Sequence, residues 1–90
     1  MRKAQSPTAD PQVLALEALG WVLGDPERAL RFLSLTGLDP GELRDGLGNP
    51  ALLAAVLDFL AGHEPDLLAA ADALGVAAQD LARAGEDLKR

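Results

Sequence analysis

The sequence predicts an all-α fold: a compact bundle of about six short helices without a β-sheet. Three observations lead to this prediction. Hydrophobic residues make up 49% of the 90-residue chain, and most of them are leucine and alanine, which favour helices. Residues that favour strands are scarce, because the chain has no isoleucine and only four valines. Prolines and glycines recur where short helices would begin and end.

Five of the six prolines follow an acidic or amide residue, and each such pair is typical of a helix start. The side-chain oxygen accepts hydrogen bonds from the free N–H groups of the first turn. Proline has no N–H to satisfy, and its φ angle is already helical. The pairs are Asp10-Pro11, Asp25-Pro26, Asp39-Pro40, Asn49-Pro50 and Glu64-Pro65, of which the glutamate is the weakest cap.

Single glycines are predicted to end the helices, because glycine adopts the left-handed conformation at least cost. The expected ends are Gly24, Gly37, Gly48, Gly62 and Gly75. The helices are then expected over residues 10–23, 25–36, 39–47, 49–61, 64–74 and 77–89. We predict a single helical domain over residues 10–90, frayed at its C-terminus, after a disordered tail over residues 1–9.

Two segments are apolar on nearly all sides, VLALEALGWVL at 13–23 and ALLAAVLDFLA at 51–61. They are expected to form the central helix pair. Residues of the first half recur at matching positions of the second, such as Trp21 and Phe59, so two similar three-helix halves are expected whether or not a duplication produced them. The helix over 25–36 is amphipathic, and its inner face is expected to hold Ala29, Leu30, Leu33 and Leu35.

The composition points to a cytoplasmic protein. The chain has no cysteine, which excludes disulfides, thiolate catalysis and cysteine metal sites. No run is long enough to span a bilayer. Asp10, Pro11 and Glu17 interrupt the N-terminal stretch that superficially resembles a signal peptide.

The charge distribution disfavours nucleic acids and anionic lipid. Between Asp10 and Asp87 the chain carries fourteen acidic side chains against four arginines, a formal charge of −10. Segments 29–47 and 67–85 nonetheless have the order of a helix-turn-helix motif, with a glycine turn between two helices. Their second helices carry mostly carboxylates where base-reading residues are needed, so nucleic-acid binding is the weaker alternative.

Residues with catalytic chemistry are few. His63 is the single histidine, and with Glu64 and Asp66 it forms a polar group at a helix junction, which is too small a set to predict a metal site or acid–base pair. Ser34 and Thr36 have no activating base nearby in sequence. We expect no enzyme activity, no cofactor and no small-molecule ligand.

Three longer sequence words, ALGWVL at 18–23, RFLSLTGLDP at 31–40 and VLDFLAGHEPDLLAA at 56–70, suggest a relationship. Through them the chain resembles a family of small bacterial helical proteins, domain of unknown function 3572, over roughly residues 11–85. The resemblance implies an all-α domain of bacterial origin. It transfers no functional residues, because the family has no assigned activity.

Three residues are candidates for contact with a partner. Trp21 is a typical hot-spot residue, although a tryptophan in an apolar helix is more often part of the core. Arg28 and Arg31 lie one turn apart on the predicted outer face, where Arg31 is also expected to pair with Glu27. We expect a non-catalytic interaction or structural module whose partner is another protein or a second copy; the alternative is a helix-turn-helix regulator.

Overall fold

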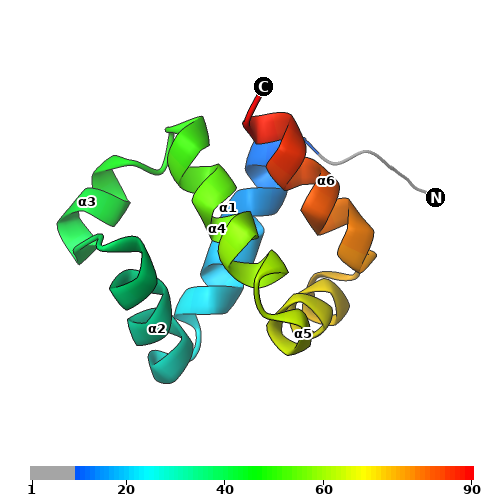
Figure 1. Cartoon of the computed structure of the whole chain (residues 1–90), viewed down its shortest axis with the longest axis horizontal. Helices are drawn as coiled ribbons and strands as arrows, with labels where there is room; N and C mark the ends of the chain where they lie inside the picture. Colours follow the sequence, from blue (N-terminus) through cyan, green and yellow to red (C-terminus); the bar gives the residue numbers. More distant parts are fainter. Residues whose placement is uncertain (1–9) are drawn as a thin grey trace.

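The computed structural model describes residues 10–90, and within that range it contains six α-helices and no strand. The all-α prediction is therefore confirmed. The predicted disordered tail over residues 1–9 lies outside the described residues. The helices are α1 (Pro11–Leu23), α2 (Pro26–Thr36), α3 (Pro40–Asp45), α4 (Pro50–Ala61), α5 (Glu64–Leu74) and α6 (Ala78–Leu88) (Figure 1).

Four of the five predicted caps are present. Asp10 accepts a hydrogen bond from the Gln12 amide at 2.8 Å, and Asn49 accepts one from the Ala51 amide at 2.9 Å. Asp25 and Asp39 cap α2 and α3 in the same way. At α3 the Glu42 carboxylate also accepts from the Asp39 amide at 3.1 Å, which completes a capping box.

Four of the five predicted glycine ends are confirmed, whereas the fifth cap and the glycine end at Gly48 are wrong. Glu64 is the first residue of α5, and His63 occupies the cap position without a side-chain hydrogen bond, because a proline at the second helical position is also tolerated. Gly37 and Gly75 are left-handed, with φ of 74° and 73°, whereas the two glycines that end α1 and α4 remain right-handed. Helix α3 ends two residues earlier than expected, at Asp45, and Gly46 caps it in place of Gly48.

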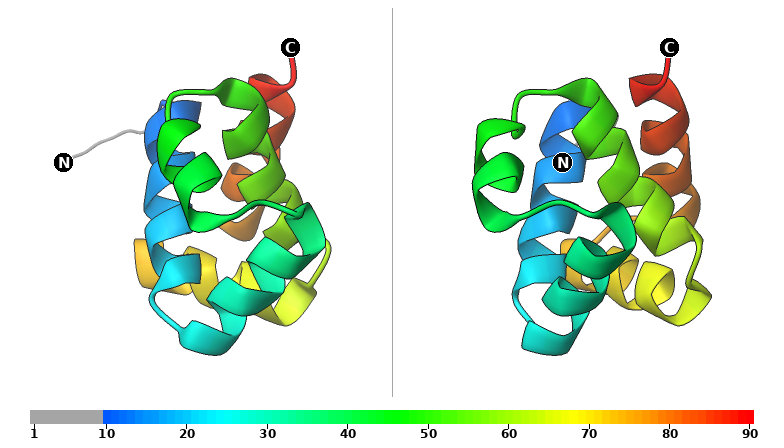
Figure 2. Two further views of the ribbon diagram at one scale, coloured as in Figure 1. Left: turned by 90° about the vertical axis from the view of Figure 1, so that its left-hand side faces the viewer. Right: turned by 60° about the vertical axis from the view of Figure 1, so that its left-hand side comes forward.

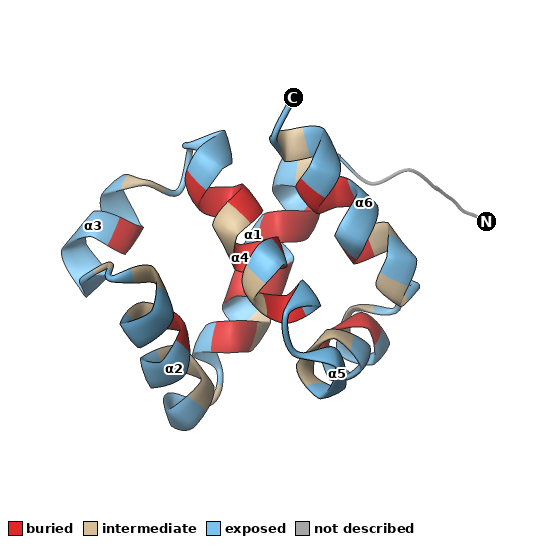
Figure 3. Ribbon diagram, viewed as in Figure 1, coloured by how far each residue is buried: buried red, intermediate tan, exposed pale blue. Residues whose placement is uncertain are grey.

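The centre of the bundle is a group of three helices rather than a pair. Helices α1 and α4 pack together as predicted, but α6 packs against both of them. Helices α4 and α6 approach closely at Gly85, where a Cβ would lie 3.2 Å from the Cβ of Leu57. Figure 3 shows the buried residues concentrated on α4, with further buried residues on α1 and α6, while α2 and α3 are mostly exposed.

The predicted inner face of α2 is only partly right, because Leu33 packs against the core but Leu30 and Leu35 do not. Phe32 is fully buried, and its ring meets that of Phe59 edge to face, with centroids 5.3 Å apart. Leu30 and Leu35 are 69% and 72% exposed. A ring of this size decides the orientation of an eleven-residue helix, because it buries more apolar surface than either leucine.

The two three-helix halves are not alike in the structure. Helix α6 has eleven residues and packs against both α1 and α4, whereas its counterpart α3 has six residues and lies at the periphery (Figure 1). The short α3 leaves one side of α1 without a covering helix of full length.

Candidate functional site

Two of the predicted contact residues, Trp21 and Arg28, bind each other. The Arg28 guanidinium carbon lies 3.6 Å from the centroid of the Trp21 ring, a cation–π contact, and an Arg28 Nη donates to the Trp21 carbonyl oxygen. Trp21 is partly buried and packs against the core. The guanidinium also lies near Gly24, so a positive charge is fixed beside the C-terminal end of α1.

The third predicted residue, Arg31, belongs to a different cluster. It forms an ion pair with Asp66 of α5, which replaces the expected pair with Glu27. The His63 Nδ1 also lies 3.0 Å from the Asp66 carboxylate. The Arg31 guanidinium lies 5.5 Å from the Phe59 ring centroid. One carboxylate therefore joins α2 to the α4–α5 junction.

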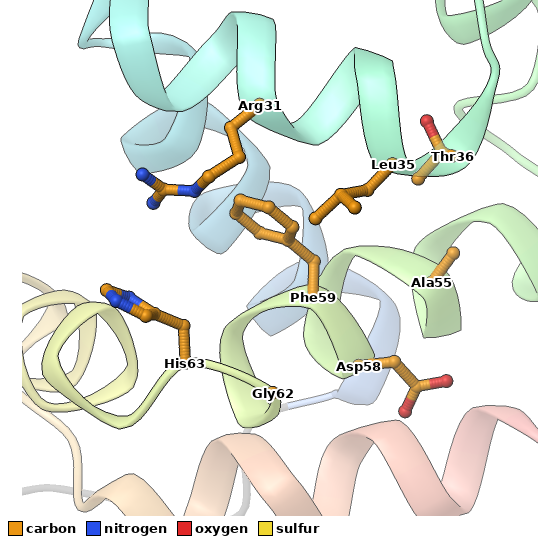
Figure 4. A pocket seen from close by; sticks show the side chains of 8 residues that line it. All are labelled: Arg31, Leu35, Thr36, Ala55, Asp58, Phe59, Gly62 and His63. Atoms are coloured by element: carbon orange, nitrogen blue, oxygen red, sulfur yellow. The ribbon is translucent and has the colours of Figure 1, made fainter.

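This cluster borders an apolar groove of about 410 Å³ between α2 and α4. Phe59 lies in the middle of the groove, with Leu35 beside it and the Arg31 and His63 side chains on one flank (Figure 4). The ionic groups of that flank already satisfy one another through Asp66. No group of three or more His, Asp or Glu side chains able to hold a metal ion lies within residues 10–90.

A second apolar surface lies on α1, apart from the three predicted contact residues. Val13, Leu16 and Leu23 are 50%, 41% and 41% exposed. With the exposed Gly20 they follow each other at intervals of three, four and three residues, so the four lie on one side of the helix. We call these four residues the α1 face. Helix α1 runs along one edge of the molecule (left view of Figure 2).

The α1 face continues into a second groove, of about 370 Å³, between α1, α2 and α3. Its lining is almost entirely apolar, and Arg44 supplies the one charged side chain. Leu23 belongs both to the α1 face and to this α1–α3 groove, so the two form one continuous apolar surface. The groove is lined by Leu19, Leu23, Leu33, Pro40, Leu43, Arg44 and Leu47.

Gly20 has no evident role within the chain. Its φ angle is not positive, and a Cβ at this position would meet nothing within 4 Å. A glycine in the middle of a helix costs roughly 0.5–1 kcal/mol relative to alanine. The sequence signal for the α1 face was therefore present: a helix that is apolar all round and contains an unexplained glycine.

The other features that the sequence singled out do not form a candidate site. Thr36 donates to the Phe32 carbonyl oxygen at 2.8 Å, as expected of a hydroxyl at a helix end, and Ser34 is exposed. In the first helix-turn-helix segment, α3 exposes Glu42 and Asp45 beside Arg44. None of the helices between residues 10 and 90 combines the length and apolar character needed to cross a bilayer.

A family model described as "Protein of unknown function (DUF3572)" matches residues 8–90. No curated protein and no solved structure matches the chain.

Proposed function

The chain belongs to the DUF3572 family, and we propose that it is a protein-interaction module that docks through the α1 face and the adjoining α1–α3 groove. The observation that carries this proposal is the exposure of Val13, Leu16 and Leu23 in one row on a helix that is otherwise built into the core. Apolar side chains scattered singly on a surface are ordinary, but a continuous row beside an apolar groove is typical of an interface.

The same surface is poor in charge, which fits docking better than solvation. Glu17 is the one charged residue of α1, and Arg44 is the one charged residue of the groove. Interface centres are depleted in charged residues, and their charges gather at the rim. Elsewhere the exposed surface carries many more acidic side chains, which keep the remainder of the protein in solution.

The roles of the predicted contact residues change accordingly. Trp21 and Arg28 form the rim of the α1 face, where Arg28 is held in place by the tryptophan ring. Arg31 is separate from it, since it forms an ion pair with Asp66 of α5. We therefore expect substitutions of Arg31 to leave partner binding unchanged.

The test is capture of partners from the native cell with wild-type protein and with Leu16→Gln. Leu68→Gln is the matched control, since Leu68 is 55% exposed but lies on α5. An identified partner is then purified and its binding measured directly. We expect Leu16→Gln to weaken binding about tenfold or more, as for an interface hot spot, and Leu68→Gln to have no effect. Equal binding by both variants contradicts the proposal.

We also propose a cytoplasmic location, which rests on the cysteine-free composition. Fractionation of the native cell tests it. Recovery with the periplasmic or membrane fraction contradicts it.

A further inference from the structure

The exposed row on α1 is complementary to itself. Its four residues are large, large, small and large, spaced three, four and three positions apart. When two copies of α1 run antiparallel with residue 18 at the two-fold axis, Leu16 of each copy lies opposite Gly20 of the other. In the same register Val13 lies opposite Leu23. Each bulky leucine then meets the empty space above a glycine, which is how helices approach closely.

We infer that the partner of the α1 face is a second copy of this chain, paired through antiparallel α1 helices in that register; this inference rests on the proposed function. It gives Gly20 the role that the single chain leaves unexplained. In the pair, Leu16 of one copy occupies the space that a side chain at residue 20 of the other copy would fill.

The charges beside the α1 face are also complementary. Glu17 has no ion pair within residues 10–90, and Arg28 is fixed over Trp21 on the same flank of α1. In an antiparallel pair related by a two-fold axis, like flanks lie side by side. Glu17 of one copy then lies between Glu17 and Trp21 of the other, within reach of the second copy's Arg28. Two attractive Glu17–Arg28 contacts offset one repulsive contact between the glutamates.

The available area sets the strength of this pairing. A stable interface of standard size buries about 800 Å² per partner, which is roughly one sixth of the 5053 Å² that the chain exposes. A helix of thirteen residues is about 20 Å long and about 10 Å across, so a single helix pair covers much less. We therefore expect a reversible dimer with a dissociation constant in the micromolar to millimolar range.

Sedimentation equilibrium from about 1 µM to about 1 mM tests the pairing. Wild type and Leu68→Gln are expected to dimerise, whereas Leu16→Gln and Gly20→Leu are expected to stay monomeric. Glu17→Arg is expected to dimerise more weakly, because arginine then faces Arg28. Gly20→Leu cannot owe its result to unfolding, because a side chain at this position meets only open space, and its thermal melt provides the check.

Single cysteines test the register, since the chain has none of its own. In the antiparallel pair, two copies of residue 13 lie about 15 Å apart along the helix, too far for a disulfide. Val13→Cys alone is therefore expected to stay uncrosslinked under mild oxidation, and a mixture of Val13→Cys with Leu23→Cys to form a mixed dimer. Crosslinking of Val13→Cys with itself overturns the antiparallel register.

A wild-type protein that is monomeric throughout the concentration range overturns the second copy as partner. The proposed function fails separately, when Leu16→Gln binds the purified cellular partner as tightly as Leu68→Gln does. If the wild-type protein is monomeric but Leu16→Gln no longer binds that partner, the α1 face is still a docking surface. Its partner is then another protein rather than a second copy.

Discussion

Helices α1 and α4 look alike in the sequence and differ in the structure. Each is apolar on nearly all sides, begins with a capped proline and contains a single charged residue, Glu17 or Asp58. Helix α4 is covered by α1, α2, α5 and α6, and six of its residues are buried. Helix α1 leaves Val13, Leu16 and Leu23 at the surface. Both helices pack against four others, so the difference lies in the residues at their exposed positions, which are Ala51 and Ala61 in α4 but valine and leucine in α1.

The single charges show the same difference. Asp58 of α4 is neutralised within the chain, with its carboxylate 2.9 Å from the Nζ of Lys89. Glu17 of α1 has no ion pair within the described part of the chain. Helix α4 thus has its charge paired within its own chain, and none of its large apolar side chains is exposed. Helix α1 retains apolar surface and an unpaired charge, which is why we assign docking to it.

The largest expected effect is on the free energy of unfolding, where substitutions in α4 and α1 should differ. Leu57→Ala in α4 should lower the free energy of unfolding by about 2–5 kcal/mol, because Leu57 is 2% exposed and its loss leaves a cavity. Leu16→Ala in α1 should change it by roughly 0.5–1 kcal/mol at most, since the side chain is 41% exposed. Urea unfolding at low protein concentration measures both. A similar loss for the two variants would contradict the contrast between α1 and α4.

The next largest effect is expected from two glycine substitutions, which should change the stability of the monomer in opposite directions. Gly85→Leu should destabilise the protein by about 1–3 kcal/mol, because a side chain there collides with Leu57 of α4. Gly20→Leu should stabilise the monomer by roughly 0.5–1 kcal/mol, because leucine favours the helix and meets open space. Thermal melts of the two variants provide the comparison, and destabilisation by Gly20→Leu would show that the monomer needs the glycine.

The sequence predicted the ends of the helices better than their faces. Helix starts depend on local hydrogen bonds, so Asp10, Asp25, Asp39 and Asn49 could be assigned directly as caps. Which side of a helix is buried depends on distant partners. The contact of Phe32 with Phe59 turned α2 away from its predicted inner face.

The same limit applies to the candidate site. Trp21, Arg28 and Arg31 were selected as chemically suitable contact residues, but their intramolecular partners were not visible in the sequence. The individual residues of the α1 face could not be picked out, because an apolar helix looks equally buried on every side. Which of its apolar positions stay exposed depends on how the other helices pack around α1, and that packing is set by residues distant in the sequence.

The matched caps of α1 and α4 should behave alike, unlike their faces. Asp10→Ala and Asn49→Ala each remove a side-chain acceptor for the second amide of the helix. Each should cost about 0.5–2 kcal/mol, and the two values should be similar. Chemical denaturation measures both. A much larger cost at Asn49 would mean that the start of α4 depends on more than its cap.

The smallest expected effect concerns the charge of α4. Hydrogen bonding to Asp58 raises the pKa of Lys89 above its ordinary value of 10.5. A raised pKa in the folded state stabilises the fold while the lysine is protonated. The contribution is therefore complete below about pH 10.5 and is lost as pH rises through the raised value. Thermal melts across this range should show wild type converging on Lys89→Gln.

Lys89→Arg is the control for this loss, because arginine keeps its charge and its ability to bind Asp58 throughout the range. It should retain the advantage over Lys89→Gln at the highest pH tested. Glu17→Gln in α1 should follow the wild-type profile, since Glu17 has no cationic partner in the described chain. If all variants lose stability in parallel, the contact between Lys89 and Asp58 contributes nothing, and the charge contrast between α1 and α4 disappears.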